Sequence, residues 1–186
     1  MDFNFQRDCR GIISIICGSE IDKSTEQKAV EIGRFLAKNN YAIACGGLFG
    51  GMEAVCKGAK QENGLTIGII PYKQKNAANR YVDIAIPVPF SQARNIVVVL
   101  SGDIVVAIGG KAGTLSEMAF AWIYEKPIIA LTGVGGWSAK LAGKSIDNRR
   151  SDRIYEAESP EKVLELVNKL INKKNKKIDL DLAEEF

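Results

Sequence analysis

The 186-residue sequence contains no histidine. Histidine is the usual general acid–base group of enzymes, the partner of nucleophilic serine or cysteine, and a common ligand of catalytic zinc. Its absence therefore excludes a Ser-His-Asp or Cys-His mechanism and the usual catalytic zinc ligand set. We expect a protein without a bound metal.

Cysteines are few, and their spacing does not suit metal or redox chemistry. Cys9, Cys17, Cys45 and Cys56 include no C-x-x-C pair, and the last three lie in apolar stretches. This pattern indicates buried, reduced thiols in a cytosolic protein.

The sequence also lacks a strong charge imbalance and long apolar runs. The net charge of +3 is small, whereas nucleic-acid binding needs clustered positive charge. No apolar run approaches the roughly 20 residues of a membrane span, and the first residues do not resemble a signal peptide. We expect a cytoplasmic protein that binds neither nucleic acid nor membranes.

The sequence does contain an alternation of apolar runs and amphipathic segments. Apolar runs predict strands at residues 11–17, 41–45, 65–70, 81–86, 103–108 and 127–131, with helices between them. This order predicts an α/β fold, a Rossmann-like doubly wound parallel sheet with helices on both faces.

We expect one nucleotide-binding-like domain over residues 1–173 and a charged C-terminal tail over residues 174–186. The last helix is predicted from Ser159 to about Asn172. Glycines between Gly133 and Trp137 predict a loop. Residues 138–158 are poorly periodic, and only a short edge strand ending at Ala157 is predicted there.

Two glycine-rich stretches each follow a predicted strand and open a predicted helix, namely Gly46–Met52 and Gly109–Thr114. Glycine lets the backbone turn sharply and approach a ligand closely, and a helix N-terminus attracts anions. Either stretch alone also fits a tight turn that binds nothing. Neither matches a Walker A loop or a dinucleotide-binding fingerprint. Two such turns in one sheet favour a phosphate-bearing ligand.

The carboxyl ends of parallel strands meet at one edge of a sheet. We therefore expect one site there. The candidate ligand-binding residues are Gly18, Ser19, Gly46, Gly47, Gly50, Gly51, Met52, Gly109, Gly110, Lys111, Gly113 and Thr114.

The candidate catalytic residues are Arg94 and Glu117. Arg94 offers a planar fork of donors for phosphate, although a solvated helix residue fits its position as well. Glu117 lies one helical turn after Gly113. It is either a site carboxylate or a first-turn acid that favours the helix dipole. Glu53 has the same geometry in the other stretch and is the rival carboxylate.

Gly110–Glu117 resembles the P-G-G-x-G-T-x-x-E signature of the LOG family, the cytokinin riboside 5′-monophosphate phosphoribohydrolases often labelled "lysine decarboxylase". Gly18–Ser19 resembles the G-S-S loop of that family, and Gly46–Met52 resembles its G-G-G-x-x-G-L-M loop. The resemblance covers residues 11–131. The sequence resembles even more closely one branch of LOG-like proteins, the branch that includes the molybdenum cofactor carrier proteins.

Three positions depart from the family pattern. Gly109 and Lys111 replace the proline and the second glycine of the signature, and Asn95 replaces the usual lysine after the family's arginine. Arg94 and Glu117 are kept.

The resemblance implies a nucleotide-like small molecule as ligand, with no required cofactor. As an enzyme, the protein would hydrolyse the N-glycosidic bond of a nucleoside 5′-monophosphate to base and ribose 5-phosphate. Glu117 would then stabilise the positive charge on the ribose, and Arg94 would hold the ligand.

The alternative is a carrier or sensor of a nucleotide or molybdopterin-type cofactor without turnover. The resemblance also implies a homodimer or a higher homo-oligomer. Nothing in the sequence supports a pyridoxal phosphate site beyond generic phosphate-binding loops, so we do not expect a lysine decarboxylase.

Overall fold

The structure is a computed structural model that describes residues 9–184. Its core is a seven-stranded sheet in the order β4-β3-β2-β1-β5-β6-β7. All neighbouring strands are parallel. The strands are β1 Gly11–Cys17, β2 Tyr41–Cys45, β3 Thr66–Ile70, β4 Ile84–Pro87, β5 Ile104–Ile108, β6 Ile128–Leu131 and β7 Tyr155–Ala157.

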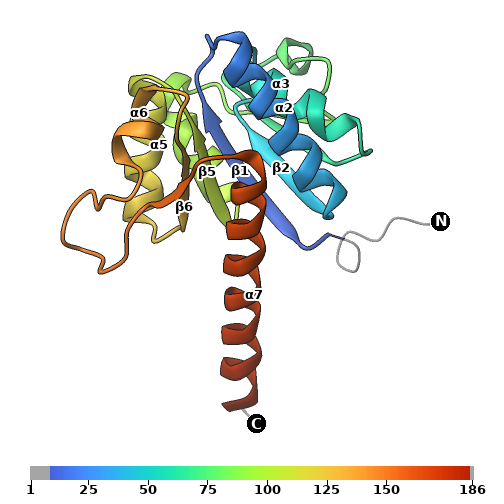
Figure 1. Cartoon of the computed structure of the whole chain (residues 1–186). Helices are drawn as coiled ribbons and strands as arrows, with labels where there is room; N and C mark the ends of the chain where they lie inside the picture. Colours follow the sequence, from blue (N-terminus) through green and yellow to red (C-terminus); the bar gives the residue numbers. More distant parts are fainter. Residues whose placement is uncertain (1–8, 185–186) are drawn as a thin grey trace.

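Helices cover both faces of this sheet (Figure 1). One face packs against α2 Lys23–Lys38, α3 Gly51–Lys60 and α7 Pro160–Glu184. The other packs against α4 Asn95–Ser101, α5 Ala112–Ile123 and α6 Gly136–Leu141, and short 3₁₀ turns lie at Lys75–Ala77 and Ser91–Arg94. The predicted Rossmann-like, doubly wound α/β fold is confirmed.

Two glycines let α2 and α3 pack closely. A Cβ atom at Gly33 would lie 2.0 Å from the carbonyl oxygen of Val55, and one at Gly58 would lie 1.9 Å from that of Val30. Real Cβ atoms do not approach this closely, so only glycine permits the contact. This packing fixes the start of α3 relative to β1 and β2.

The order of the strands reverses between β1 and β5. The chain runs from β1 outward to β4 on one side, and from β5 outward to β7 on the other. The loops that leave β1 and β5 therefore diverge to opposite faces, which leaves a crevice at their carboxyl ends. Gly18 and Gly109 begin these two loops.

The last helix is longer than predicted. It runs to Glu184 instead of ending near Asn172, so most of the charged tail is helical. Figure 1 shows α7 extending well beyond the sheet. Lysine and asparagine do not stop a helix, and no glycine or proline follows Pro160 to do so. Residues 185–186 lie outside the described part of the chain.

The segment after β6 also differs from the prediction. Gly136 and Trp137 begin α6 and do not belong to a loop, whereas the short edge strand ending at Ala157 is confirmed as β7. Cys45 and Cys56 are buried thiols as expected, but Cys9 and Cys17 are only partly buried. Across residues 9–184, no helix has both the length and the hydropathy that crossing a bilayer requires.

Candidate functional site

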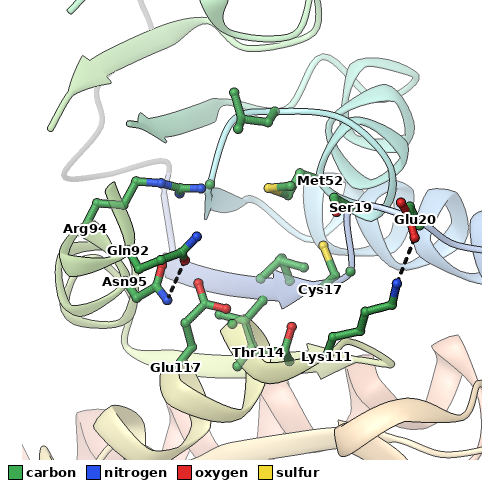
Figure 2. A pocket seen from close by; sticks show the side chains of 16 residues that line it. Cys17, Ser19, Glu20, Met52, Gln92, Arg94, Asn95, Lys111, Thr114 and Glu117 are labelled. Carbon is green, nitrogen blue, oxygen red and sulfur yellow. Dashed lines mark hydrogen bonds and ion pairs between the residues drawn. The ribbon is translucent and has the colours of Figure 1, made fainter. Parts of the chain in front are cut away.

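A cavity of about 300 Å³, here called the inner cavity, opens between the carboxyl ends of β1 and β5 (Figure 2). Its volume lies at the lower end of the range of small-molecule sites. Most of the predicted site residues line it. They are Gly18, Ser19, Gly46, Met52, Arg94, Lys111, Gly113, Thr114 and Glu117.

The other predicted residues, Gly47, Gly50, Gly51, Gly109 and Gly110, are not among the lining residues. They lie in the loops behind the wall of the inner cavity. Gly110 has φ +87°, and a Cβ atom there would lie 2.1 Å from Thr114 Oγ1. Gly51 approaches Cys17 in the same way, since its Cβ atom would lie 2.8 Å from the thiol sulfur. These glycines therefore allow close backbone approaches.

The N-terminus of α5 opens into the inner cavity. Lys111 is its N-cap, and no described side chain caps the helix there. Gly113 and Thr114 bring the first turn to the cavity wall. Free N–H groups and the positive end of the helix dipole attract an anion to such a position.

Ser138 in α6 holds this loop in place. Its Oγ accepts a hydrogen bond from Gly109 N at 2.7 Å and donates one to Leu131 O at 2.7 Å. The carbonyl oxygens of Gly109 and Gly110 accept hydrogen bonds from Ser138 N and Trp137 N, both at 3.1 Å. The loop is therefore fixed before any ligand arrives.

Glu117 is buried in the cavity wall, only 8% exposed. Burial raises the pKa of its carboxyl to about 8, although the positive charge of Arg94 acts in the opposite direction. The carboxyl is therefore mostly protonated at neutral pH and offers a hydrogen-bond donor to a ligand. Glu53 does not line this cavity, so of the two carboxyl groups weighed from the sequence only Glu117 belongs to its wall.

Arg94 lies buried on the opposite wall. Its Nη1 donates a hydrogen bond to Ile69 O at 2.8 Å, and burial lowers the pKa of the guanidinium. Gly46 makes room for it, because a Cβ atom there would lie 2.5 Å from Nη1. In the described structure no ion pair joins Arg94 to Glu117; both face the open cavity (Figure 2).

Sequence reasoning missed four polar residues in the cavity wall, Cys17, Glu20, Gln92 and Asn95. Glu20 forms an ion pair with Lys111 at 2.8 Å between Oε2 and Nζ. Asn95 Nδ2 donates to Ser116 Oγ at 2.9 Å, which ties α4 to the first turn of α5. Glu20 and Lys111 are 91 positions apart, so no local pattern indicates their contact.

Within the part of the chain that the structure describes, no group of three or more Cys, Asp or Glu side chains is arranged to hold a metal ion. The polar groups around the inner cavity instead suit an organic anion. A helix N-terminus and a lysine attract phosphate, while a protonated carboxyl and an arginine offer hydrogen-bond donors to other groups of the ligand.

Comparison with known proteins places this site in a family. A model of the SLOG cluster4 family matches residues 10–164. The chain belongs to this family. An uncharacterised protein from Archaeoglobus fulgidus is 38% identical over 119 residues, which cover 64% of this chain and 78% of the relative.

Three solved structures share the fold over most of their length. The protein TM1055 is 31% identical with a TM-score of 0.80, covering 85% of this chain and 98% of that one. The molybdenum cofactor binding protein of the phototrophic bacterium Rippkaea orientalis is 36% identical, with a TM-score of 0.77 and coverages of 86% and 96%. The molybdenum cofactor carrier protein of Chlamydomonas reinhardtii is 27% identical, with a TM-score of 0.76 and coverages of 87% and 98%.

These findings confirm the resemblance to LOG-like proteins and to the branch with the molybdenum cofactor carriers. The homodimer expected from that resemblance stays a prediction.

Proposed function

We propose that this SLOG-family protein binds a phosphate-bearing, nucleotide-like ligand in the inner cavity and holds it without turnover, as a carrier or sensor. The uncapped N-terminus of α5 is the observation that carries this proposal. It faces a cavity whose two carboxyl groups leave it without a partner, because Glu117 is mostly protonated and Glu20 is already paired with Lys111. A phosphate group would satisfy the free N–H groups of the helix.

The protonation state of Glu117 weakens one of the two ways in which a carboxyl group assists hydrolysis, the stabilisation of positive charge. Cleavage of an N-glycosidic bond passes through an oxocarbenium-like state, which an ionised carboxylate stabilises. Burial keeps the Glu117 carboxyl mostly protonated at neutral pH, with a pKa of about 8. A bound phosphate would add negative charge nearby and favour the protonated form further.

The structural neighbours support a ligand of this class. Two of them are a molybdenum cofactor binding protein and a molybdenum cofactor carrier protein. We therefore include molybdopterin-type cofactors beside nucleotides as ligands of the proposed carrier. Both combine a phosphate with a flat ring system, and the inner cavity offers donors for each part.

Hydrolysis of a nucleoside 5′-monophosphate is the second candidate function. Arg94 and Glu117, the two residues that the LOG resemblance assigns to catalysis, do face the same cavity. In the role that the resemblance gives it, the stabilisation of positive charge on the ribose, Glu117 would have to be ionised. The rate of the reaction would therefore rise with pH until the pH passes about 8, the pKa of that carboxyl.

An assay for free base separates the two functions. The purified protein is incubated with the 5′-monophosphates of adenosine, guanosine, cytidine and uridine at pH 6 and pH 8, and released base is measured by chromatography. We expect no release above background at either pH, together with a raised melting temperature in the presence of a bound nucleotide.

Release of base at pH 8 that disappears in Glu117→Gln and Arg94→Ala would overturn the carrier and establish the hydrolase. The matched control is Glu31→Gln, which changes an exposed carboxylate on α2 and should behave as the unmodified protein.

A further inference from the structure

A second cavity of about 500 Å³, here called the outer cavity, adjoins the inner one. Ser19 and Glu20 line both cavities. The outer cavity is lined by Glu26 of α2, by Glu53 and Lys57 of α3, and by Arg80 and Tyr81. The loop after β1 therefore separates the inner cavity from the outer cavity.

The Lys111–Glu20 ion pair lies at this loop (Figure 2). Both side chains are more than 80% exposed, at 83% and 81%. An exposed pair of this kind adds little stability and yields readily to a competing charge. A phosphate with two negative charges would draw Lys111 away from Glu20 and connect the cavities.

The outer cavity offers the contacts that a nucleoside uses. The Arg80 guanidinium lies over the Tyr81 ring, 5.0 Å from its centroid, and so presents a flat cationic surface. Flat heterocycles stack on such a surface. Glu26 and Glu53 have no ion-pair partner among the side chains that the structure describes. Carboxylates in this setting accept hydrogen bonds from ribose hydroxyls.

We propose that the two cavities form one groove for a nucleoside diphosphate ester, a molecule whose two bulky parts are joined by phosphates. One phosphate lies at the N-terminus of α5, and the next takes the place of Glu20 beside Lys111. The outer nucleoside stacks on Arg80 and bonds to Glu53. Glu20 therefore competes with the second phosphate of the ligand for Lys111. This inference rests on the proposed phosphate site.

Titration calorimetry with two probes tests the groove. AMP fills only the inner cavity, whereas diadenosine 5′,5′-diphosphate carries a second nucleoside for the outer one. We expect diadenosine diphosphate to bind about tenfold more tightly than AMP. Arg80→Ala and Glu53→Gln should each reduce this ratio to about twofold or less while leaving the AMP affinity unchanged.

Two further variants complete the design. Glu20→Gln removes the competitor and should tighten diadenosine diphosphate binding about threefold at low salt, and less at high salt. Lys38→Ala is the matched control, because Lys38 ends α2, roughly 18 Å along the helix from Glu26. It should change neither affinity.

Equal affinities for AMP and diadenosine diphosphate would overturn the groove and leave the proposed phosphate site unaffected. A tenfold ratio that survives both Arg80→Ala and Glu53→Gln would also overturn it. Failure of both probes to bind would contradict the proposed function itself, and the groove with it.

Discussion

Replacing Glu117 with glutamine is expected to stabilise the protein at pH 7 by about 3 kcal/mol. Burial raises the pKa of this carboxyl from its ordinary 4.5 to about 8. Above pH 4.5 the unfolded chain releases the proton, but the folded chain keeps it. The free energy of unfolding therefore falls as the pH rises from about 4.5 to about 8. Glutamine does not titrate, so the unfolding free energy of the variant does not fall in this pH range for this reason.

Urea denaturation of both proteins between pH 4 and pH 9 measures the effect. The difference in unfolding free energy should be near its minimum at pH 4, grow by roughly 1.4 kcal/mol per pH unit between about 4.5 and 8, and then level off. Glu31→Gln, an exposed carboxylate on α2, is the control and should stay within about 0.5 kcal/mol of the unmodified protein. A Glu117→Gln variant that is less stable at every pH would contradict the assigned environment of Glu117.

This result would identify Glu117 as a residue retained at a cost to stability. Such residues concentrate at functional sites, where activity and not packing determines the side chain. A first-turn acid that only complements the helix dipole would be exposed and ionised. The buried position of Glu117 already argues against that alternative.

Replacing Gly110 with alanine is expected to abolish binding at the inner cavity. The new Cβ atom would lie 2.1 Å from Thr114 Oγ1 and 2.4 Å from Thr114 Cβ, at a residue with φ +87°. Either the loop or the first turn of α5 must move. We expect AMP affinity to fall by about 100-fold or more, and stability to fall by about 2 kcal/mol.

Calorimetric titration with AMP and a thermal melt measure these two effects. Gly113→Ala is the matched control for stability. The nearest atom to its new Cβ would be Gln92 Oε1 at 3.9 Å, and alanine favours the helix by about 0.5–1 kcal/mol. A Gly110→Ala protein that binds AMP as tightly as the unmodified protein would show that this loop does not hold the phosphate.

The sequence predicts the position of the site because topology controls it. Glycine turns after β1, β2 and β5 must meet at one sheet edge in any parallel sheet of this order. The sequence does not predict Ser138, whose hydrogen bond spans 29 positions to Gly109 N. Its helix α6 has only six residues, too few to show a helical period.

Two other misses also have physical reasons. The pairing of Lys111 with Glu20 depends on where two surface loops meet, and neither loop carries a pattern that indicates it. Residues 174–186 are predicted to form a tail because this segment is strongly charged. Helix α7 nevertheless continues to Glu184, since the helix propensity of the backbone permits this.

The central claim is that a phosphate group anchors the ligand at the N-terminus of α5. Titration calorimetry of AMP against adenosine tests it most directly, because the two molecules differ only in the phosphate. We predict that AMP binds about 100-fold more tightly, or about 2.7 kcal/mol. Equal affinities for AMP and adenosine would contradict the claim.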